Sequence, residues 1–254
     1  AEPVKVYQDF STLDLISGGR AEIGVGRGSF IESFPLFGYD LDDYHELFEE
    51  KLDLLLKINT QENVTWKGKL RAPMENQTVY PRATKNGKLP VWIAVGGTPE
   101  SVLRAARLGL PLVVAIIGGL PKQFKPLIAY YKQEYLKNGH NPDEMQIGIH
   151  SHTLVSEDPE VIDAYFENYA AQMNRIGSTR GWSPYTKMQY EGGRSKDGAL
   201  FIGNSEEVAA KINEVKEMFG LTRYIAHMDV GAPNHDVMMK SIELFGTKVA
   251  EKVR

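Results

Sequence analysis

A glycine-rich run beside one arginine is the first place in this chain where residue types and spacing could do chemistry. In Gly24-Val25-Gly26-Arg27-Gly28, the glycines let a ligand approach the backbone closely, and Arg27 offers a planar, permanent charge that suits phosphate. The run follows a short strand-like segment that starts near Ala21. Its spacing differs from the dinucleotide-binding fingerprint, which needs a later glycine and an acidic residue further on. The alternative is a plain turn with a solvated arginine.

Two histidines are the second candidate. His150 and His152 lie in a strand-like run, 146–155, and their spacing puts both side chains on one face. Near the carboxyl end of that strand they could enter a ligand pocket. Packed, hydrogen-bonded histidines with a structural role are the alternative. Such a pair is similar to the metal site of amidohydrolases, but no lysine follows in a bridging position, so we expect no metal site.

The elements that must position these residues repeat in one order: an apolar run, a glycine loop and an amphipathic helix. The run 112–117 is apolar without alternation, as expected for a parallel strand covered on both faces. This order indicates parallel βαβ units in a single domain, since no shift in composition marks a boundary. The predicted core strands start near Ala21, Val91, Leu112, Gln146 and Tyr224, and the apolar piece 199–202 is assigned to an excursion.

Capping residues predict where the helices begin and end. A helix over residues 3–16 can end at Gly18 or its neighbour, because glycine accepts left-handed dihedral angles. Asp40 is expected to cap the next helix, and Thr98 caps a helix that begins with proline. Asn204, with a glutamate three residues later, predicts a capping box.

Composition excludes several classes of function. The 254 residues are 42% hydrophobic and 24% charged, which is typical of a soluble globular protein. A formal charge of -4 with scattered lysines and arginines argues against nucleic acid as a partner. The sequence has neither a membrane-length apolar run nor a signal pattern, so we expect no membrane partner and a cytoplasmic location. Because cysteine is absent, redox chemistry would require a cofactor.

Seven sequence segments, in family order over nearly the whole chain, carry a resemblance to a known family. They are the S-G-G-R segment leading to G-V-G-R-G, G-Y-D-L-D-D-Y at 38–44, W-I-A-V-G-G-T-P-E-S at 92–101, A-R-L-G-L-P at 106–111, G-A-L-F-I-G at 198–203, D-V-G at 229–231 and S-I-E-L-F-G at 241–246. With them the chain resembles the bacterial luciferase-like, flavin-dependent monooxygenase family.

The resemblance implies a TIM barrel, an α/β fold of eight parallel strands. The five core strands would be the fourth to the eighth, in one domain over 1–254 with excursions at about 59–88 and 177–203. Family members carry three further βα units before the first helix of this chain, or about 90 residues at roughly 30 residues per unit. We therefore expect an incomplete barrel, whose open strand edge favours association into a homo-oligomer.

The resemblance also implies a cofactor, FMN or alternatively a deazaflavin. The residues that would bind it are Arg27, Gly28, Gly96, Gly97, Thr98, Gly118 and Gly119, and the catalytic candidates are His150 and His152. The implied activity is that of a monooxygenase, which uses reduced FMN from a separate reductase, molecular oxygen and a small organic substrate. A flavin-binding relative without turnover, or an inactive fragment, is the alternative.

Overall fold

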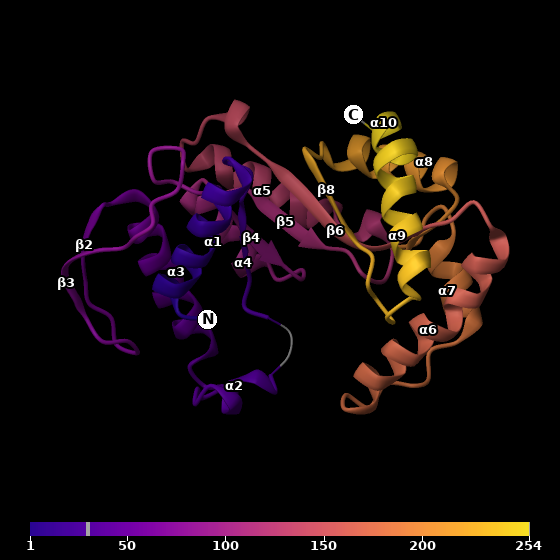
Figure 1. Ribbon diagram of the computed structural model, residues 1–254, viewed down its shortest axis with the longest axis horizontal. Helices are drawn as coiled ribbons and strands as arrows, with labels where there is room; N and C mark the ends of the chain where they lie inside the picture. The colour runs from indigo at the N-terminus through magenta and orange to yellow at the C-terminus, as the bar shows by residue number, and fades with distance from the viewer. Residues whose placement is uncertain (29–30, 254) are drawn as a thin grey trace. The chain divides into compact units, whose positions relative to one another are not determined.

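The computed structural model describes residues 1–28 and 31–253 and divides into two compact units, Ala1–Val95 and Gly96–Arg254. Each unit combines parallel strands with helices, so both are α/β (Figure 1). The assignment of the whole chain to one domain stays a prediction. Among the described helices, none has the length and apolar character needed to cross a membrane.

The first unit is built around two parallel strands and two long helices. Its elements are α1 (Pro3–Ser17), β1 (Ile23–Val25), α2 (Ser33–Leu36), α3 (Tyr44–Thr60), β2 (Asn63–Trp66), β3 (Met74–Thr78) and β4 (Val91–Val95). Strand β1 runs parallel to β4, with Ile23 opposite Val91, as the sequence predicted for consecutive core strands. The predicted excursion contains the antiparallel hairpin of β2 and β3, which lie side by side in Figure 1.

Local chemistry explains where the helices of this unit begin and end. The prediction for α1 is confirmed, because Gly18 takes the left-handed conformation with a φ of 67° and its N–H reaches the last turn. The prediction that Asp40 caps the next helix is wrong. Asp40 Oδ1 accepts the N–H of Asp42 at 3.0 Å and closes a turn, so α3 begins only at Tyr44.

The second unit carries the larger set of parallel strands. Its elements are α4 (Pro99–Leu108), β5 (Leu112–Ala115), the short 3-10 helix η1 (Pro121–Phe124), α5 (Lys125–Lys137), a second 3-10 turn η2 (Pro142–Glu144), β6 (Ile147–Val155), α6 (Pro159–Ser178), α7 (Lys187–Arg194), β7 (Phe201–Gly203), α8 (Ser205–Phe219), β8 (Arg223–His227), α9 (His235–Leu244), the π turn η3 (Phe245–Val249) and α10 (Ala250–Val253). Thr98 and Asn204 precede α4 and α8, as predicted. Asn204 forms the predicted capping box with Glu207, whereas the Thr98 hydroxyl donates to Ser101 Oγ.

Strand β6 is the axis of this unit and pairs in parallel with three others. It runs beside β5 and β8, with Leu112 opposite Ile147 and His227 opposite His152. Its last residues also pair with β7, a pairing that the sequence did not predict because the apolar piece there is only a few residues long. The order of β6 and β8 as neighbours agrees with the predicted succession of core strands and places their histidines in register.

Candidate functional site

In the first unit, Arg27 is held by the first turn of α3. The Arg27 side chain is partly exposed, and its Nη1 lies 3.0 Å from His45 Nδ1. Because a guanidinium only donates hydrogen bonds, His45 Nδ1 is the acceptor. The Arg27 Cζ atom also lies 5.0 Å from the centre of the Tyr44 ring, within the range of a cation–π contact. Two residues of α3, Tyr44 and His45, thus orient the guanidinium.

The backbone beside Arg27 is held by the same turn. Gly28 has a φ of 76°, which favours glycine, and its carbonyl accepts the hydroxyl of Tyr44 at 2.7 Å. Tyr44 and His45 therefore both position the loop that follows β1. The residues Ser29 and Phe30, also part of the candidate glycine-rich segment, lie outside the described residues.

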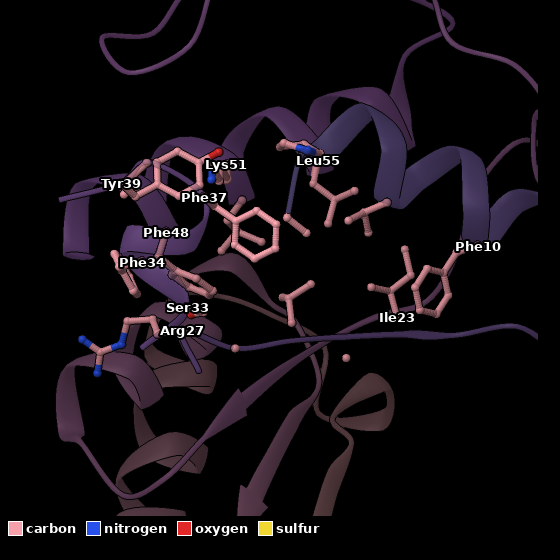
Figure 2. Close-up of a pocket in the computed structure, with 18 residues that line it drawn as sticks. Phe10, Ile23, Arg27, Ser33, Phe34, Phe37, Tyr39, Phe48, Lys51 and Leu55 are labelled. Carbon is pink, nitrogen blue, oxygen red and sulfur yellow. The ribbon is translucent and has the colours of Figure 1, made fainter. Parts of the chain in front are cut away.

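A cavity of about 380 Å³ lies next to Arg27, between α1, β1, α2 and α3. Four phenylalanine rings contribute to its wall, and Figure 2 shows the Arg27 guanidinium at one end, pointing away from Phe10 and Ile23. Lys51, also on the wall, holds its ammonium 3.7 Å from the centre of the Tyr39 ring. The cavity offers a mostly apolar volume with cations at its margin.

In the second unit, both glycine loops are exposed. Gly97 and Gly119 have φ values of 130° and 71°, conformations that side chains rarely adopt. A Cβ built on Gly96 or Gly118 would meet no atom within 4 Å, so the backbone there is open to close approach. Thr98 precedes α4 and donates its hydroxyl to Ser101 Oγ at 2.8 Å.

The two predicted histidines share one face of β6, and a third imidazole joins them from β8. The ring centre of His227 lies 4.9 Å from that of His150 and 5.3 Å from that of His152. His152 Nδ1 lies 2.8 Å from the hydroxyl of Tyr169 on α6. His227 Nε2 lies 2.7 Å from Asp229 Oδ1, just beyond the strand. The structure therefore brings His150 and His152 into a cluster of polar rings.

Burial favours the neutral forms of His150 and His152. It lowers the pKa of His152 to about 3, and the neighbouring His227 and His150 act in the same direction. Burial, with His227 close by, also lowers the pKa of His150. Both imidazoles are accordingly neutral at pH 7. Burial raises the pKa of Tyr169, so its hydroxyl keeps its proton.

His227 has one ring nitrogen engaged and one without a partner. His227 Nε2 faces the Asp229 carboxylate, and the buried Nδ1 has no hydrogen-bond partner among the described residues. The pair of His227 and Asp229 was not predicted from the sequence, although the alternation along 223–227 puts His227 on one face of its strand. In the described part of the chain, no cluster of histidines and carboxylates has the arrangement of a metal site.

The site residues predicted from sequence fall into separate groups. Arg27 and Gly28 belong to the first unit, while the glycine loops 96–98 and 118–119 and the histidine pair belong to the second. Within the second unit, His150 and His152 share one face of β6, and each lies against His227. The shared role of the remaining residues in binding a phosphate stays a prediction.

The sequence model of the luciferase-like monooxygenase family matches residues 1–222. The chain belongs to this family. The uncharacterized protein y4vJ of Sinorhizobium fredii is 24% identical over 100% of the chain and 74% of its own length. The alkanal monooxygenase alpha chain of the Kryptophanaron alfredi symbiont is 28% identical, over 56% of the chain and 39% of its own length.

Several solved structures share the fold of this chain. The monooxygenase RslO1 from Streptomyces bottropensis has a TM-score of 0.83 at 21% identity, over 100% of this chain and 75% of that one. The coenzyme F420 dependent tetrahydromethanopterin reductase from Methanopyrus kandleri has a TM-score of 0.72 at 17% identity, over 100% and 80%. The oxygenating constituent of 3,6-diketocamphane monooxygenase from Pseudomonas putida, in complex with FMN, has a TM-score of 0.70 at 18% identity, over 100% and 77%.

These similarities give the fold class as the luciferase-like TIM barrel. Its parallel core strands in this chain are β1, β4, β5, β6 and β8, which are the five predicted from the sequence. The similar solved structures include one in complex with FMN and one that is coenzyme F420 dependent.

Proposed function

We propose that the protein is a flavin-dependent oxidoreductase, a monooxygenase that acts with reduced FMN and molecular oxygen on a small organic substrate. The observation that carries this proposal is the family match over residues 1–222. Reduced FMN would come from a separate reductase, and association with a second copy of the chain is part of the same proposal.

The residues of this chain fit a flavin. Arg27 is oriented by His45 and Tyr44, and its guanidinium suits a phosphate as a charge-assisted donor. In the second unit, the loop 96–98 opens α4, and backbone N–H groups at a helix N-terminus favour an anion. The open space at Gly96 and Gly118 supports close approach of a flat ring to the backbone.

Bound reduced flavin supplies the electrons that activate molecular oxygen. The side chains of this chain bind, exclude water and hold protons. His152 is nearly fully buried and neutral, so it offers hydrogen bonds to a ligand without adding charge. Asp229 holds the ring of His227 so that Nδ1 is an acceptor, and this is the atom at which we place proton uptake from a ligand.

Two other functions remain as alternatives to FMN-dependent oxygenation. A deazaflavin-dependent oxidoreductase would use the same loops, and the F420-dependent reductase among the similar structures favours it. A flavin-binding protein without turnover is the second alternative. Binding of FMN with no oxygen consumption when reductant and candidate substrates are present would favour that alternative.

Replacing Arg27 by alanine tests the phosphate assignment. If Arg27 pairs with the FMN phosphate, Arg27→Ala weakens FMN binding by about one to two decades, the equivalent of roughly 1.5 to 3 kcal/mol for a charge-assisted pair. Riboflavin lacks the phosphate, so its affinity should hardly change. Titration of both ligands by quenching of flavin fluorescence measures the two dissociation constants.

Arg20→Ala is the matched control, because Arg20 is an exposed arginine of the same unit whose Nε donates to the carbonyl of Ser17. It should leave both affinities unchanged. Equal losses for FMN and riboflavin in Arg27→Ala would show that Arg27 supports the loop or the ring, and absence of FMN binding by the unaltered protein would refute the FMN proposal.

A further inference from the structure

Lys211, on α8, is a buried lysine whose ammonium is surrounded by backbone carbonyls. Its Nζ lies 2.7 Å from the carbonyl oxygens of Ser195 and Leu200, 3.3 Å from that of Gly193 and 3.5 Å from that of Arg194. The residue is only 7% exposed, which is rare for lysine unless its charge has partners. An ammonium has three N–H donors, so the four carbonyls can occupy all of them.

These carbonyls belong to the end of one helix and the approach to one strand. Gly193 and Arg194 are the last residues of α7 and Ser195 is its C-cap, where carbonyls lack intrahelical partners and the helix dipole is negative. Leu200 directly precedes β7. A single charge on α8 therefore ties the end of α7 to the start of β7.

Helix α7 in turn contacts the aromatic layer behind the histidines. Its Tyr190 is fully buried and donates its hydroxyl to the carbonyl of Ile162 on α6 at 2.9 Å. The ring of Tyr190 lies 5.8 Å from that of Tyr169, whose hydroxyl is the partner of His152 Nδ1. The contacts thus run without a gap from Lys211 through α7 and Tyr169 to His152.

We propose that Lys211 is a positioning residue for the candidate site: by holding the end of α7, its ammonium fixes the packing of Tyr190 on Tyr169 and, through it, the ring of His152. The inference deepens the proposed function, and it rests on that function in one respect, the assignment of His152 to the functional site. Its structural link, from Lys211 to the imidazole, can be measured without flavin.

The charge of Lys211 sets the pH range of this link. Burial lowers the pKa of Lys211 to about 8, so the ammonium form still predominates at pH 7. Among the described residues, three charged groups act on this pKa. Arg194 on α7 favours loss of the proton from Lys211. Glu214 on α8 and Asp197, in the loop between α7 and β7, favour its retention. Above about pH 8 the neutral amine keeps two N–H donors for four carbonyls.

The test follows the imidazole nitrogens of His152 by NMR in protein labelled at histidine. Lys211→Met, which keeps the length of the side chain and removes its donors, should shift the His152 signals and speed amide exchange in α7 by roughly tenfold or more, as expected for lost hydrogen bonds to a charged group. Lys211→Arg keeps a charge with several donors and should largely preserve both readouts. Lys216→Met is the matched control, because Lys216 also lies on α8 and donates to a helix-end carbonyl, that of Val253, outside α7.

Unchanged His152 signals in folded Lys211→Met would overturn the inference, and so would an equal shift in Lys216→Met. If Lys211→Met does not fold, titration of the unaltered protein from about pH 7 to about pH 10 replaces it. The His152 signals should then change with a midpoint near 8, and their constancy would refute the link. Failure to bind FMN, with the NMR shift present, would refute the proposed function and leave the link intact.

Discussion

The two candidate regions are stabilised in different ways. Around Arg27, the first turn of α3 supplies the contacts, and the residues that meet are partly or fully exposed. Around His152, the contacts come from an aromatic layer in which Tyr165, Tyr169 and Tyr190 are almost fully buried. The first region presents a permanent charge, and the second holds neutral rings against a core.

Because of this difference, we expect changes near Arg27 to affect ligand binding and changes near His152 to affect stability. A side chain that is open to solvent contributes little to folding, so its removal should be felt mainly by the ligand. A buried polar ring that is hydrogen-bonded is part of the core, so its removal or protonation should be felt by the whole unit. Substitutions in the two regions should therefore differ in their effects on stability, most strongly at Tyr169.

Truncation of Tyr169 should have the largest effect on stability. Tyr169→Ala removes a side chain that is 1% exposed and leaves His152 Nδ1 without its partner, so the free energy of unfolding should fall by about 3–5 kcal/mol. The matched variant Tyr44→Ala, in the exposed region, should cost about 1 kcal/mol or less. Urea denaturation followed by circular dichroism measures both. Similar losses in the two variants would contradict the contrast.

Acid should weaken the second region through His152. The unfolded chain takes up a proton near pH 6.5, whereas the folded chain resists it down to about pH 3, so stability is present above pH 6.5 and falls by ~1.4 kcal/mol per pH unit below it. The lowered pKa of His150 acts in the same direction. In His152→Gln, the loss between about pH 6 and about pH 4.5 should be smaller by about 2 kcal/mol.

Leu154→Val is the control for the pH dependence of stability, since Leu154 is a fully buried neighbour of His152 on the same face of β6. It should lower stability by about 1 kcal/mol at every pH and leave the slope unchanged. If His152→Gln shows the same slope as the unaltered protein, the neutral imidazole is not the source of the acid sensitivity.

Much of the fold follows from local sequence because its determinants are local. The glycine at residue 18 and the capping box at Asn204 predict helix boundaries within a few residues, since the groups that satisfy a helix end are close in sequence. Asp40 failed as a predicted cap because its side chain instead closes a turn with the N–H of Asp42, two residues further on. Short strands are harder, and β7 becomes visible only through its pairing with β6.

The candidate site follows from sequence only in part, because its decisive contacts join distant segments. The spacing of His150 and His152 predicts one shared face, but the position of His227 depends on the register of β8 against β6. The contact of Arg27 with His45 depends on where α3 begins. Lys211 gives no local signal, since a charged residue on a helix is normally expected to face solvent.

Removal of the Tyr44 hydroxyl, beside Arg27, should have the smallest of these effects. It should lower FMN affinity more than it lowers stability. Tyr44→Phe deletes the hydrogen bond to the carbonyl of Gly28 and keeps the ring beside Arg27, so the loop loses part of its order while the guanidinium keeps its cation–π partner. FMN affinity should fall by roughly 2- to 10-fold, the equivalent of about 0.5 to 1.5 kcal/mol, and stability should change by less than about 0.5 kcal/mol. Isothermal titration calorimetry with FMN measures the affinity, and urea denaturation measures the stability.

Tyr80→Phe, at an exposed tyrosine of the same unit, is the control and should change neither quantity. A loss of stability in Tyr44→Phe larger than its loss of FMN affinity would mean that the Arg27 region, like that of His152, is held by packing rather than arranged for a ligand.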